Sequence, residues 1–228
     1  MAGEQAIWSR SMAKSNNDVY DGPQWYKRFF AWAMATAAAD YEGEIATRKH
    51  TLFANLQGEV LEIGPGAGVN LRYLQPNTHW IGLEPNQYMH SYLHQEAEQL
   101  GLKNIDLRTE TAGNSGITDG SIDTVISTLV LCSVPDLAAT LQEILRVLKP
   151  GGRFLFIEHV AAPAGTLLRQ AQVGIRPLWQ IIGDGCCPDR NIEKALAEAG
   201  FSNISHEAFE GPVPIAIVKP HIIGTATK

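Results

Sequence analysis

Three glycines alternate with other residues in the segment Glu62-Ile63-Gly64-Pro65-Gly66-Ala67-Gly68. The segment follows a short apolar run, residues 58–64, which predicts a buried strand, and it leads into residues 68–75, which are compatible with a helix. Because glycine has no Cβ, such a loop can turn sharply and let a ligand approach its backbone closely. We interpret it as a ligand-binding loop, and a tight turn without a ligand is the alternative.

The spacing of the loop argues against two common phosphate sites. A dinucleotide fingerprint that starts at Gly64 requires glycine at position 69, where this chain has Val69. A P-loop fails as well, because no Gly-Lys-Ser/Thr follows. The carboxylate of Glu62 would repel a diphosphate, but it suits a ligand that carries an ammonium group, such as the amino-acid end of S-adenosylmethionine.

A second acid, Glu84, ends the next apolar run, residues 79–85. An acid at this place can accept hydrogen bonds from both hydroxyls of a ribose, in NAD enzymes and in S-adenosylmethionine enzymes alike. With the glycine loop it would mark a second point on the same nucleoside. The alternative is a solvated acid at the end of a strand.

The segments around these residues predict a doubly wound α/β fold with a mostly parallel, seven-stranded sheet. Strands are expected at 58–64, 79–85, 104–110, 121–131, 153–160, 203–209 and 214–226. One or two helices are expected in 24–53, with further helices at 86–101, 137–152 and 191–201 and helical elaborations between 161 and 190. Only a short Gly-Pro loop separates the last two strands, so at least one of them should run antiparallel.

Composition narrows the class of protein. The chain has 228 residues, of which 45% are hydrophobic and 18% charged, and its formal net charge is −6. This indicates a globular domain and makes nucleic acid a poor partner, since binding a phosphate backbone needs clustered Lys and Arg. Three cysteines, two of them adjacent, suggest a reducing compartment rather than a disulfide framework. No apolar stretch reaches the length of a membrane-spanning helix, and we expect a cytoplasmic protein, with peripheral membrane contact left open.

Taken together, the motifs LEIGPGAG, GLEPN, IDTVISTLVLCSVPD and ILRVLKPGGRFLFIEHV resemble those of class I S-adenosylmethionine-dependent methyltransferases with a type 11 methyltransferase domain. More narrowly, TLVLCSV, EHVAA, the DGC of residues 184–186 and VKPHIIGTATK resemble the methyltransferase-like family whose animal members methylate alkyl thiols. The resemblance covers roughly residues 50–228. It implies a Rossmann-like methyltransferase domain at 49–228, preceded by an N-terminal helical segment at 1–48 that can act as a lid.

The resemblance also implies which residues hold S-adenosylmethionine. Glu62 and the loop glycines would hold its methionine part, and Glu84 its ribose. The full set implied for the cofactor is Glu62, Gly64, Gly66, Gly68, Glu84, Pro85, Asn86, Met89, Thr111, Ala112, Thr128 and Leu129. Pro85, Asn86 and Met89 would contact the adenine. Thr111 or the Ala112 backbone would take the place of the acid that relatives carry after the third strand.

On the resemblance, the acceptor is expected to be a small hydrophobic thiol. The sulfonium methyl group is already electrophilic, so the protein must chiefly align the reactants and exclude water. A thiol with a pKa near about 8.5 needs only modest help to lose its proton. His159, at the end of the fifth expected strand, is our candidate base, and a structural histidine is the alternative. Tyr20, Tyr26, Asp184 and Cys186 are candidates for the acceptor pocket, although for the loop of Asp184 and Cys186 a cysteine packed as a small apolar residue is the favoured alternative.

The aromatic residues Trp25, Phe29 and Trp32 share one face of the expected N-terminal helix. We expect this face to pack against the domain, and a bilayer surface is the alternative. The spacing of the cysteines predicts no metal site, because zinc ligands usually come as C-x2-C pairs.

Other functions stay open on the sequence. Within the methyltransferases, the acceptor could be a lipid, a quinone or another oxygen or nitrogen nucleophile. It could also be arsenite, which three cysteines brought together would bind. Outside that class, the alternatives are a non-catalytic S-adenosylmethionine-binding module and an NAD-dependent reductase. The reductase is disfavoured by Val69 and by the lack of a Tyr-x-x-x-Lys pair.

Overall fold

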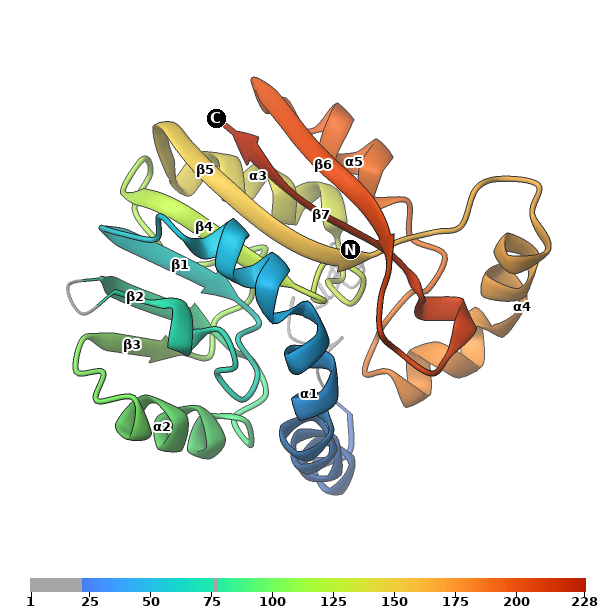
Figure 1. Ribbon diagram of the computed structural model, residues 1–228, viewed down its shortest axis with the longest axis horizontal. Coiled ribbons are helices and arrows are strands. Elements are labelled where there is room, and N and C mark those ends of the chain that lie inside the picture. Colours follow the sequence, from blue (N-terminus) through green and yellow to red (C-terminus); the bar gives the residue numbers. More distant parts are fainter. Residues whose placement is uncertain (1–21, 76–77) are drawn as a thin grey trace, which may run out of the picture.

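The computed structural model describes residues 22–75 and 78–228, which form one seven-stranded sheet with helices on both faces (Figure 1). The strand order is β3-β2-β1-β4-β5-β7-β6. The strands are β1 (Glu59–Ile63), β2 (His79–Leu83), β3 (Ile105–Arg108), β4 (Ile122–Thr128), β5 (Leu148–His159), β6 (Asn203–Glu210) and β7 (Pro220–Thr227). The helices are α1 (Gln24–Phe53), α2 (His90–Gln99), α3 (Leu137–Val147), α4 (Leu167–Ile182) and α5 (Ile192–Glu198), with 3₁₀ turns η2 (Leu71–Tyr73) and η3 (Ala216–Val218).

Strands β1 to β5 are mutually parallel, and β7 lies antiparallel to both of its neighbours, β5 and β6. The predicted fold class and the predicted antiparallel strand are therefore confirmed. The strand order reverses between β1 and β4, so the carboxyl ends of these two strands flank the switch point where ligands bind in open α/β sheets. The glycine loop follows β1 directly.

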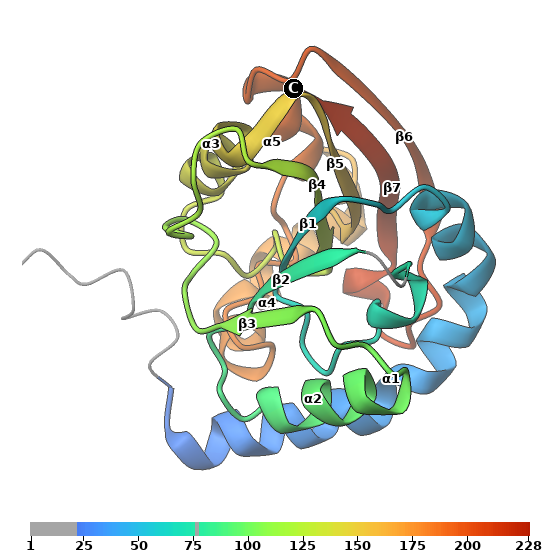
Figure 2. The same cartoon turned by 90° about the vertical axis from the view of Figure 1, so that its left-hand side faces the viewer.

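The two faces of the sheet bury different sets of side chains, as the alternation along a strand requires. On β1, Leu61 belongs to the cluster that contacts α3 and α5, whereas Val60 belongs to the cluster that contacts α2 and the end of α1. Figure 2 shows α1 and α2 on one side of the sheet and α3 and α5 on the other.

The largest differences from the sequence prediction concern three elements. The glycine loop leads into the single 3₁₀ turn η2, not into an α-helix, because the chain is already extended again at Leu74. Helix α3 ends at Val147, and the segment 148–152 instead joins β5. In the pairing of β4 with β5, Ile122 lies opposite Leu148 and Thr124 lies opposite Arg153. Two residues of β4 therefore span the same distance as five residues of β5, and the extra residues of β5, which include the Pro-Gly-Gly sequence, form a bulge. The last strand begins at Pro220 rather than at 214, because η3 occupies the preceding segment.

Helix α1 is a single helix of 30 residues. Its inner face buries Ala31, Ile45 and Lys49. The aromatic face lies outward, and the exposed fractions of Trp25, Phe29 and Trp32 are 71%, 55% and 53%. The expected packing of these three residues against the domain is therefore wrong. Among the residues described, none of the helices combines the length and the apolar character that crossing a membrane requires.

Candidate cofactor and acceptor site

All three loop glycines adopt positive φ angles, +59° at Gly64, +56° at Gly66 and +86° at Gly68. A Cβ at Gly64 would come within 2.6 Å of Val130 Cγ2, and one at Gly68 within 2.9 Å of Leu71 Cδ1. At Gly66 a Cβ would meet no atom within 4 Å. Gly64 and Gly68 are thus needed for packing, whereas Gly66 faces open space that a ligand can enter.

The carboxylate of Glu62 is buried and lies at the centre of a hydrogen-bond network. Asn70 Nδ2 donates to Glu62 Oε1 at 2.8 Å, and Trp80 Nε1 donates to Oε2 at 3.0 Å. Burial raises the pKa of Glu62, and the two hydrogen bonds oppose that shift. Glu62 therefore acts on the loop largely through Asn70, which sequence reasoning did not identify.

A buried ion pair extends this network to helix α1. Lys49 Nζ donates at 2.7 Å to Asn70 Oδ1 and at 2.7 Å to each carboxylate oxygen of Glu42. Lys49 is fully buried, and desolvation lowers its pKa although Glu42 and Glu62 raise it. Because Asn70 Nδ2 also lies 3.1 Å from Thr128 Oγ1, the network joins α1, the glycine loop and the end of β4.

Glu84 lies beside the glycine loop, as the shared edge of β1 and β2 requires. Its Oε2 accepts from Gly66 N at 3.0 Å, and its Oε1 accepts from Asn86 N at 2.9 Å. These bonds come from backbone N–H groups, and burial raises the pKa of Glu84 to about 7. The structure therefore brings together the Glu84 carboxylate and the glycine loop, which the sequence suggested belong to one nucleoside site.

The remaining residues predicted for the cofactor have different surroundings. Asn86 Nδ2 donates to the carbonyl oxygen of Lys27 at 3.2 Å, and Met89 is buried at the start of α2. Ala112 is part of the hydrophobic core, so its side chain faces the protein interior, and Thr111 forms an isolated bridge with Asn114. His90 was not predicted, yet its Nε2 lies 2.8 Å from the Glu84 carbonyl oxygen. Pro85 lies between Glu84 and Asn86, in the loop that joins β2 to α2.

The turn after β4 is held by a buried carboxylate. Glu158 Oε1 accepts from Ser127 Oγ at 2.6 Å and Val130 N at 3.3 Å, and Oε2 accepts from Leu131 N at 3.1 Å. Leu129, one of the predicted pocket residues, has the strained φ of +58° within this turn. Burial raises the pKa of Glu158 to about 8. Glu158 therefore positions the turn, and its neighbour His159 extends from the end of the adjacent strand.

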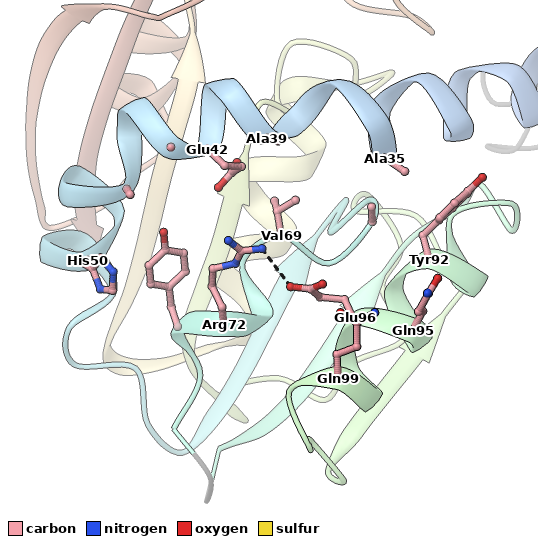
Figure 3. Close-up of a pocket in the computed structure, with 14 residues that line it drawn as sticks. Ala35, Ala39, Glu42, His50, Val69, Arg72, Tyr92, Gln95, Glu96 and Gln99 are labelled. Carbon is pink, nitrogen blue, oxygen red and sulfur yellow. Dashed lines mark hydrogen bonds and ion pairs between the residues drawn. The ribbon is translucent and has the colours of Figure 1, made fainter.

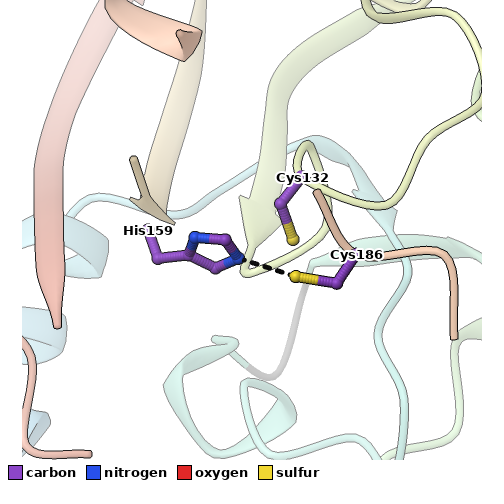
Figure 4. A group of neighbouring side chains, drawn as sticks. All are labelled: Cys132, His159 and Cys186. Atoms are coloured by element: carbon purple, nitrogen blue, oxygen red, sulfur yellow. Dashed lines mark hydrogen bonds between the residues drawn. The ribbon is translucent and has the colours of Figure 1, made fainter. Parts of the chain in front are cut away.

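Three chemically reactive side chains meet just beyond the ends of β4 and β5 (Figure 4). Cys132 Sγ, one nitrogen of the His159 ring and Cys186 Sγ all lie within 4.8 Å of one another, and all three residues are buried. His159 Nε2 is 3.1 Å from Cys186 Sγ, to which Trp179 Nε1 also donates at 3.2 Å. Burial lowers the pKa of His159, but the adjacent Cys132 outweighs it and the net shift is upward. The hydrogen bond with Cys186 and the proximity of His159 lower the pKa of Cys132.

The start of α1 closes on the loop that follows α4. Lys27 Nζ forms an ion pair of 2.7 Å with Asp184 Oδ1, and Tyr26 Oη donates to the carbonyl oxygen of Ile182 at 2.7 Å. Tyr26 and Lys27 of α1 thus meet the end of α4 and Asp184 across the molecule, and Lys27 was not identified from the sequence. Tyr20, also predicted for the acceptor pocket, lies outside the described residues.

Comparison with known proteins places this site in a family. Residues 61–156 match the family model of a methyltransferase domain. Over 212 residues the chain is 34% identical to the human thiol S-methyltransferase TMT1A, and the match covers 89% of this chain and 87% of that protein. The chain belongs to this family of S-adenosylmethionine-dependent methyltransferases.

Solved structures confirm the fold of the enzyme. The [4+2]-cyclase SpnF superimposes with a TM-score of 0.65 at 21% identity, covering 81% of this chain and 80% of that one. A SAM-dependent methyltransferase from Aquifex aeolicus gives a TM-score of 0.59 at 14% identity, covering 88% and 97%. At these identities the likeness shows the fold alone.

The site fits S-adenosylmethionine, which is the cofactor of this family. The open space over Gly66 adjoins the Glu84 carboxylate, whose oxygens each accept only one hydrogen bond from the described residues. A carboxylate with free lone pairs matches the two hydroxyls of a ribose. The free acceptor positions of Glu84 beside this open space therefore suit the ribose of an adenosine ligand.

A groove of about 500 Å³ lies between α1 and α2 (Figure 3). Its lining includes Ala39 and Glu42 of α1, Val69 of the glycine loop, and the ion pair between Arg72 and Glu96. Neither Glu84 nor His159 lines it, but Ala67 and Val69 of the glycine loop do, so the groove shares that loop with the cofactor site. The sequence did not predict the groove, because its other walls come from segments distant in the chain.

Proposed function

We propose that this methyltransferase transfers the methyl group of S-adenosylmethionine to a small hydrophobic thiol. The observation that carries the proposal is the 34% identity to a human thiol S-methyltransferase over 89% of the chain. The bound cofactor supplies an electrophilic methyl group on a sulfonium sulfur. The protein's own contribution is to hold both reactants, exclude water and help the thiol lose its proton.

For the cofactor, we assign the ribose to Glu84 and the methionine part to the loop of Gly64, Gly66 and Gly68, with Glu62 and Asn70 fixing that loop. Asn86 and Met89 would border the adenine. Support comes from the 3.0 Å hydrogen bond between Gly66 N and Glu84, which joins the two halves of the site.

For the acceptor, we assign to His159 Nε2 the role of the general base that takes the proton of the thiol. The position of this buried ring at the end of β5, beside two sulfur atoms, supports the assignment, since histidine is the side chain that most often serves as a general base. The wall of the pocket would include Cys132, Cys186 and Tyr26. Residues 1–48 would act as a lid, with the Lys27–Asp184 ion pair as its latch.

Measurement of S-adenosylhomocysteine release across thiols, phenols, amines and lipids tests the function. We expect hydrophobic thiols to give the highest kcat/KM and arsenite to give little product. Preference for a phenol, an amine or a lipid would contradict the thiol assignment. Binding of S-adenosylmethionine without product from any acceptor would indicate a non-catalytic binding module.

The outward aromatic face of α1 supports a second proposal, a weak contact with a lipid surface by an enzyme of the reducing cytoplasm. Trp25, Phe29 and Trp32 are well exposed, and Ile181 and Ile182 are exposed at the nearby end of α4. Aromatic and aliphatic side chains presented together can insert at the headgroup boundary.

We expect the wild type to float with liposomes and the triple variant Trp25→Ser, Phe29→Ser, Trp32→Ser to lose at least about half of that bound fraction. Leu100→Ser, which removes an exposed apolar residue at the end of α2, is the matched control and should float as the wild type does. Equal flotation of the triple variant and the wild type would contradict the contact.

A further inference from the structure

The cluster of Cys132, His159 and Cys186 is built from three segments far apart in the sequence. Cys132 follows β4, His159 ends β5 and Cys186 lies in the loop after α4. Each contributes one soft or borderline ligand atom, and the three atoms lie within 4.8 Å of one another (Figure 4). Thiolate and imidazole together are the preferred ligands of zinc.

We propose that these three side chains form a binding site for a thiophilic divalent cation, Zn²⁺, whose fourth position takes the sulfur of the acceptor thiol. In a tetrahedral site with metal–sulfur and metal–nitrogen distances of about 2.3 and 2.0 Å, neighbouring ligand atoms lie about 3.5–3.8 Å apart. His159 Nε2 lies 3.1 Å from Cys186 Sγ, and no two of the three ligand atoms are more than 4.8 Å apart. Shifts of about 1 Å or less would therefore complete the site.

The backbone that carries the ligands is already fixed. Cys187 N donates to the Cys132 carbonyl oxygen at 2.9 Å, which holds two of the ligand segments side by side. Arg190 Nη1 donates to the carbonyl oxygens of Leu131 and Val134 at 2.9 and 2.6 Å. Such outer contacts orient metal ligands and keep a site formed before the metal arrives.

Each ligand sulfur has a polar group beside it that can donate a hydrogen bond to it. Trp179 Nε1 donates to Cys186 Sγ, and Ser133 Oγ lies 3.4 Å from Cys132 Sγ. Hydrogen bonds of this kind stabilise negative charge on a ligating sulfur. Two thiolates and a neutral imidazole balance the charge of one Zn²⁺ before the acceptor binds.

A three-ligand site with one open position is the arrangement of catalytic zinc. The acceptor thiol would displace water from that position, form a sulfur–zinc bond and release its S–H proton to solvent. When its sulfur bonds to the methyl carbon, the bond from that carbon to the sulfonium sulfur breaks and S-adenosylhomocysteine leaves. The product is a neutral thioether, a weaker ligand, which favours its departure. This role rests on the proposed function. With metal bound, His159 Nε2 is a ligand and the cation, not the ring, lowers the pKa of the thiol.

The position of Cys187, the third cysteine, favours zinc as the bound metal over trivalent arsenic, which would be held by three thiolates. Cys187 Sγ accepts from Gln180 Nε2 at 3.1 Å and lies 3.4 Å from Arg190 Nη2, outside the group of three ligand atoms. The arrangement expected for an arsenite enzyme, with three cysteines brought together, is not the one found.

The test measures metal directly. The protein, carrying a tag without histidines, is purified under reducing conditions, dialysed against metal-free buffer and analysed by plasma mass spectrometry. We expect about one zinc per chain in the wild type and in the matched control Cys187→Ala. Cys132→Ala and Cys186→Ala should retain about a tenth of that or less. Binding of S-adenosylmethionine by each variant shows that it has folded.

Replacement of zinc by Co²⁺ gives a readout that needs no variant. The wild type should show thiolate-to-cobalt charge transfer and the visible bands of a tetrahedral site, and a hydrophobic thiol should increase the charge-transfer band. Absence of metal from the wild type, or equal metal in Cys132→Ala, would overturn the site. A cobalt spectrum unchanged by thiol would overturn its role in acceptor binding.

Activity separates this inference from the proposed function. Methyl transfer to thiols at the full rate by metal-free protein would overturn the metal's role and leave the function intact. Zinc binding with a thiol response but no S-adenosylhomocysteine from any thiol would contradict the function and support the metal site.

Discussion

Replacing Glu84 with Gln should weaken the binding of S-adenosylmethionine about 100-fold, equivalent to about 2.7 kcal/mol. The carboxylate accepts from the N–H groups of Gly66 and Asn86 and still has lone pairs for the ribose hydroxyls. An amide keeps one oxygen but turns an NH₂ group toward a backbone donor, so it loses both charge and a hydrogen bond. A hydrogen bond to a charged group contributes about 1.5–3 kcal/mol.

Isothermal titration of the purified variants measures this effect. Glu110→Gln is the matched control, because Glu110 is an exposed acid after the neighbouring strand β3. It should bind the cofactor as the wild type does. Unchanged affinity in Glu84→Gln would show that the ribose lies elsewhere.

The same carboxylate should make cofactor binding depend on pH. Burial raises the pKa of Glu84 to about 7, so below pH 7 the group is increasingly protonated and cannot accept two hydroxyls. Affinity should therefore fall as the pH drops from 8 to 6, and Glu84→Gln should remove most of this slope.

The free energy of unfolding should depend on pH in the opposite direction. Because the pKa of Glu84 is higher in the folded protein than in the unfolded chain, its contribution to stability is fully present below the pKa of the unfolded chain. That contribution is lost as the pH rises through about 7.

Strands β1 and β2 could be predicted because each is a short, almost fully buried apolar run that ends at a Gly or at an acid followed by Pro. The proximity of Glu84 to Gly66 follows from the same pattern, since adjacent parallel strands end at one edge of the sheet. Prediction failed where the local signal was ambiguous. The Pro-Gly-Gly of residues 150–152 resembles a helix stop, yet a bulge absorbs it inside β5.

Contacts between distant segments could not be predicted from spacing. The Lys27–Asp184 ion pair joins residues 157 positions apart, and the His159–Cys186 contact joins residues 27 apart. Each depends on how α4 and its loop return to the sheet, which no motif encodes. The burial of Lys49 could not be predicted for the same reason. A lysine on an exposed helix face and a buried lysine look alike in the sequence, and only the structure places Glu42 and Asn70 beside this one.

Replacing His159 with Ala should lower kcat for a thiol acceptor by about 100-fold or more and change the Kd for S-adenosylmethionine by less than about threefold. The ring is carried by the last residue of β5, beside two buried sulfur atoms, and in the part of the chain that the structure describes none of its hydrogen bonds reaches the glycine loop or Glu84. His206→Ala is the control, because His206 is an exposed histidine of β6 that pairs with Glu193. Equal kcat in both variants would show that His159 takes no part in the transfer.

His159→Cys then distinguishes the two ways in which this ring could act. As a base, a cysteine with a pKa near about 8.5 is a poor substitute for imidazole at pH 7, so activity should stay as low as in the alanine variant. As a ligand, a thiolate replaces the nitrogen and completes a three-sulfur site, so zinc content and much of kcat should return. Recovery with metal and none after chelation would assign thiol activation to the cation, because only a ligand role tolerates the exchange of nitrogen for sulfur.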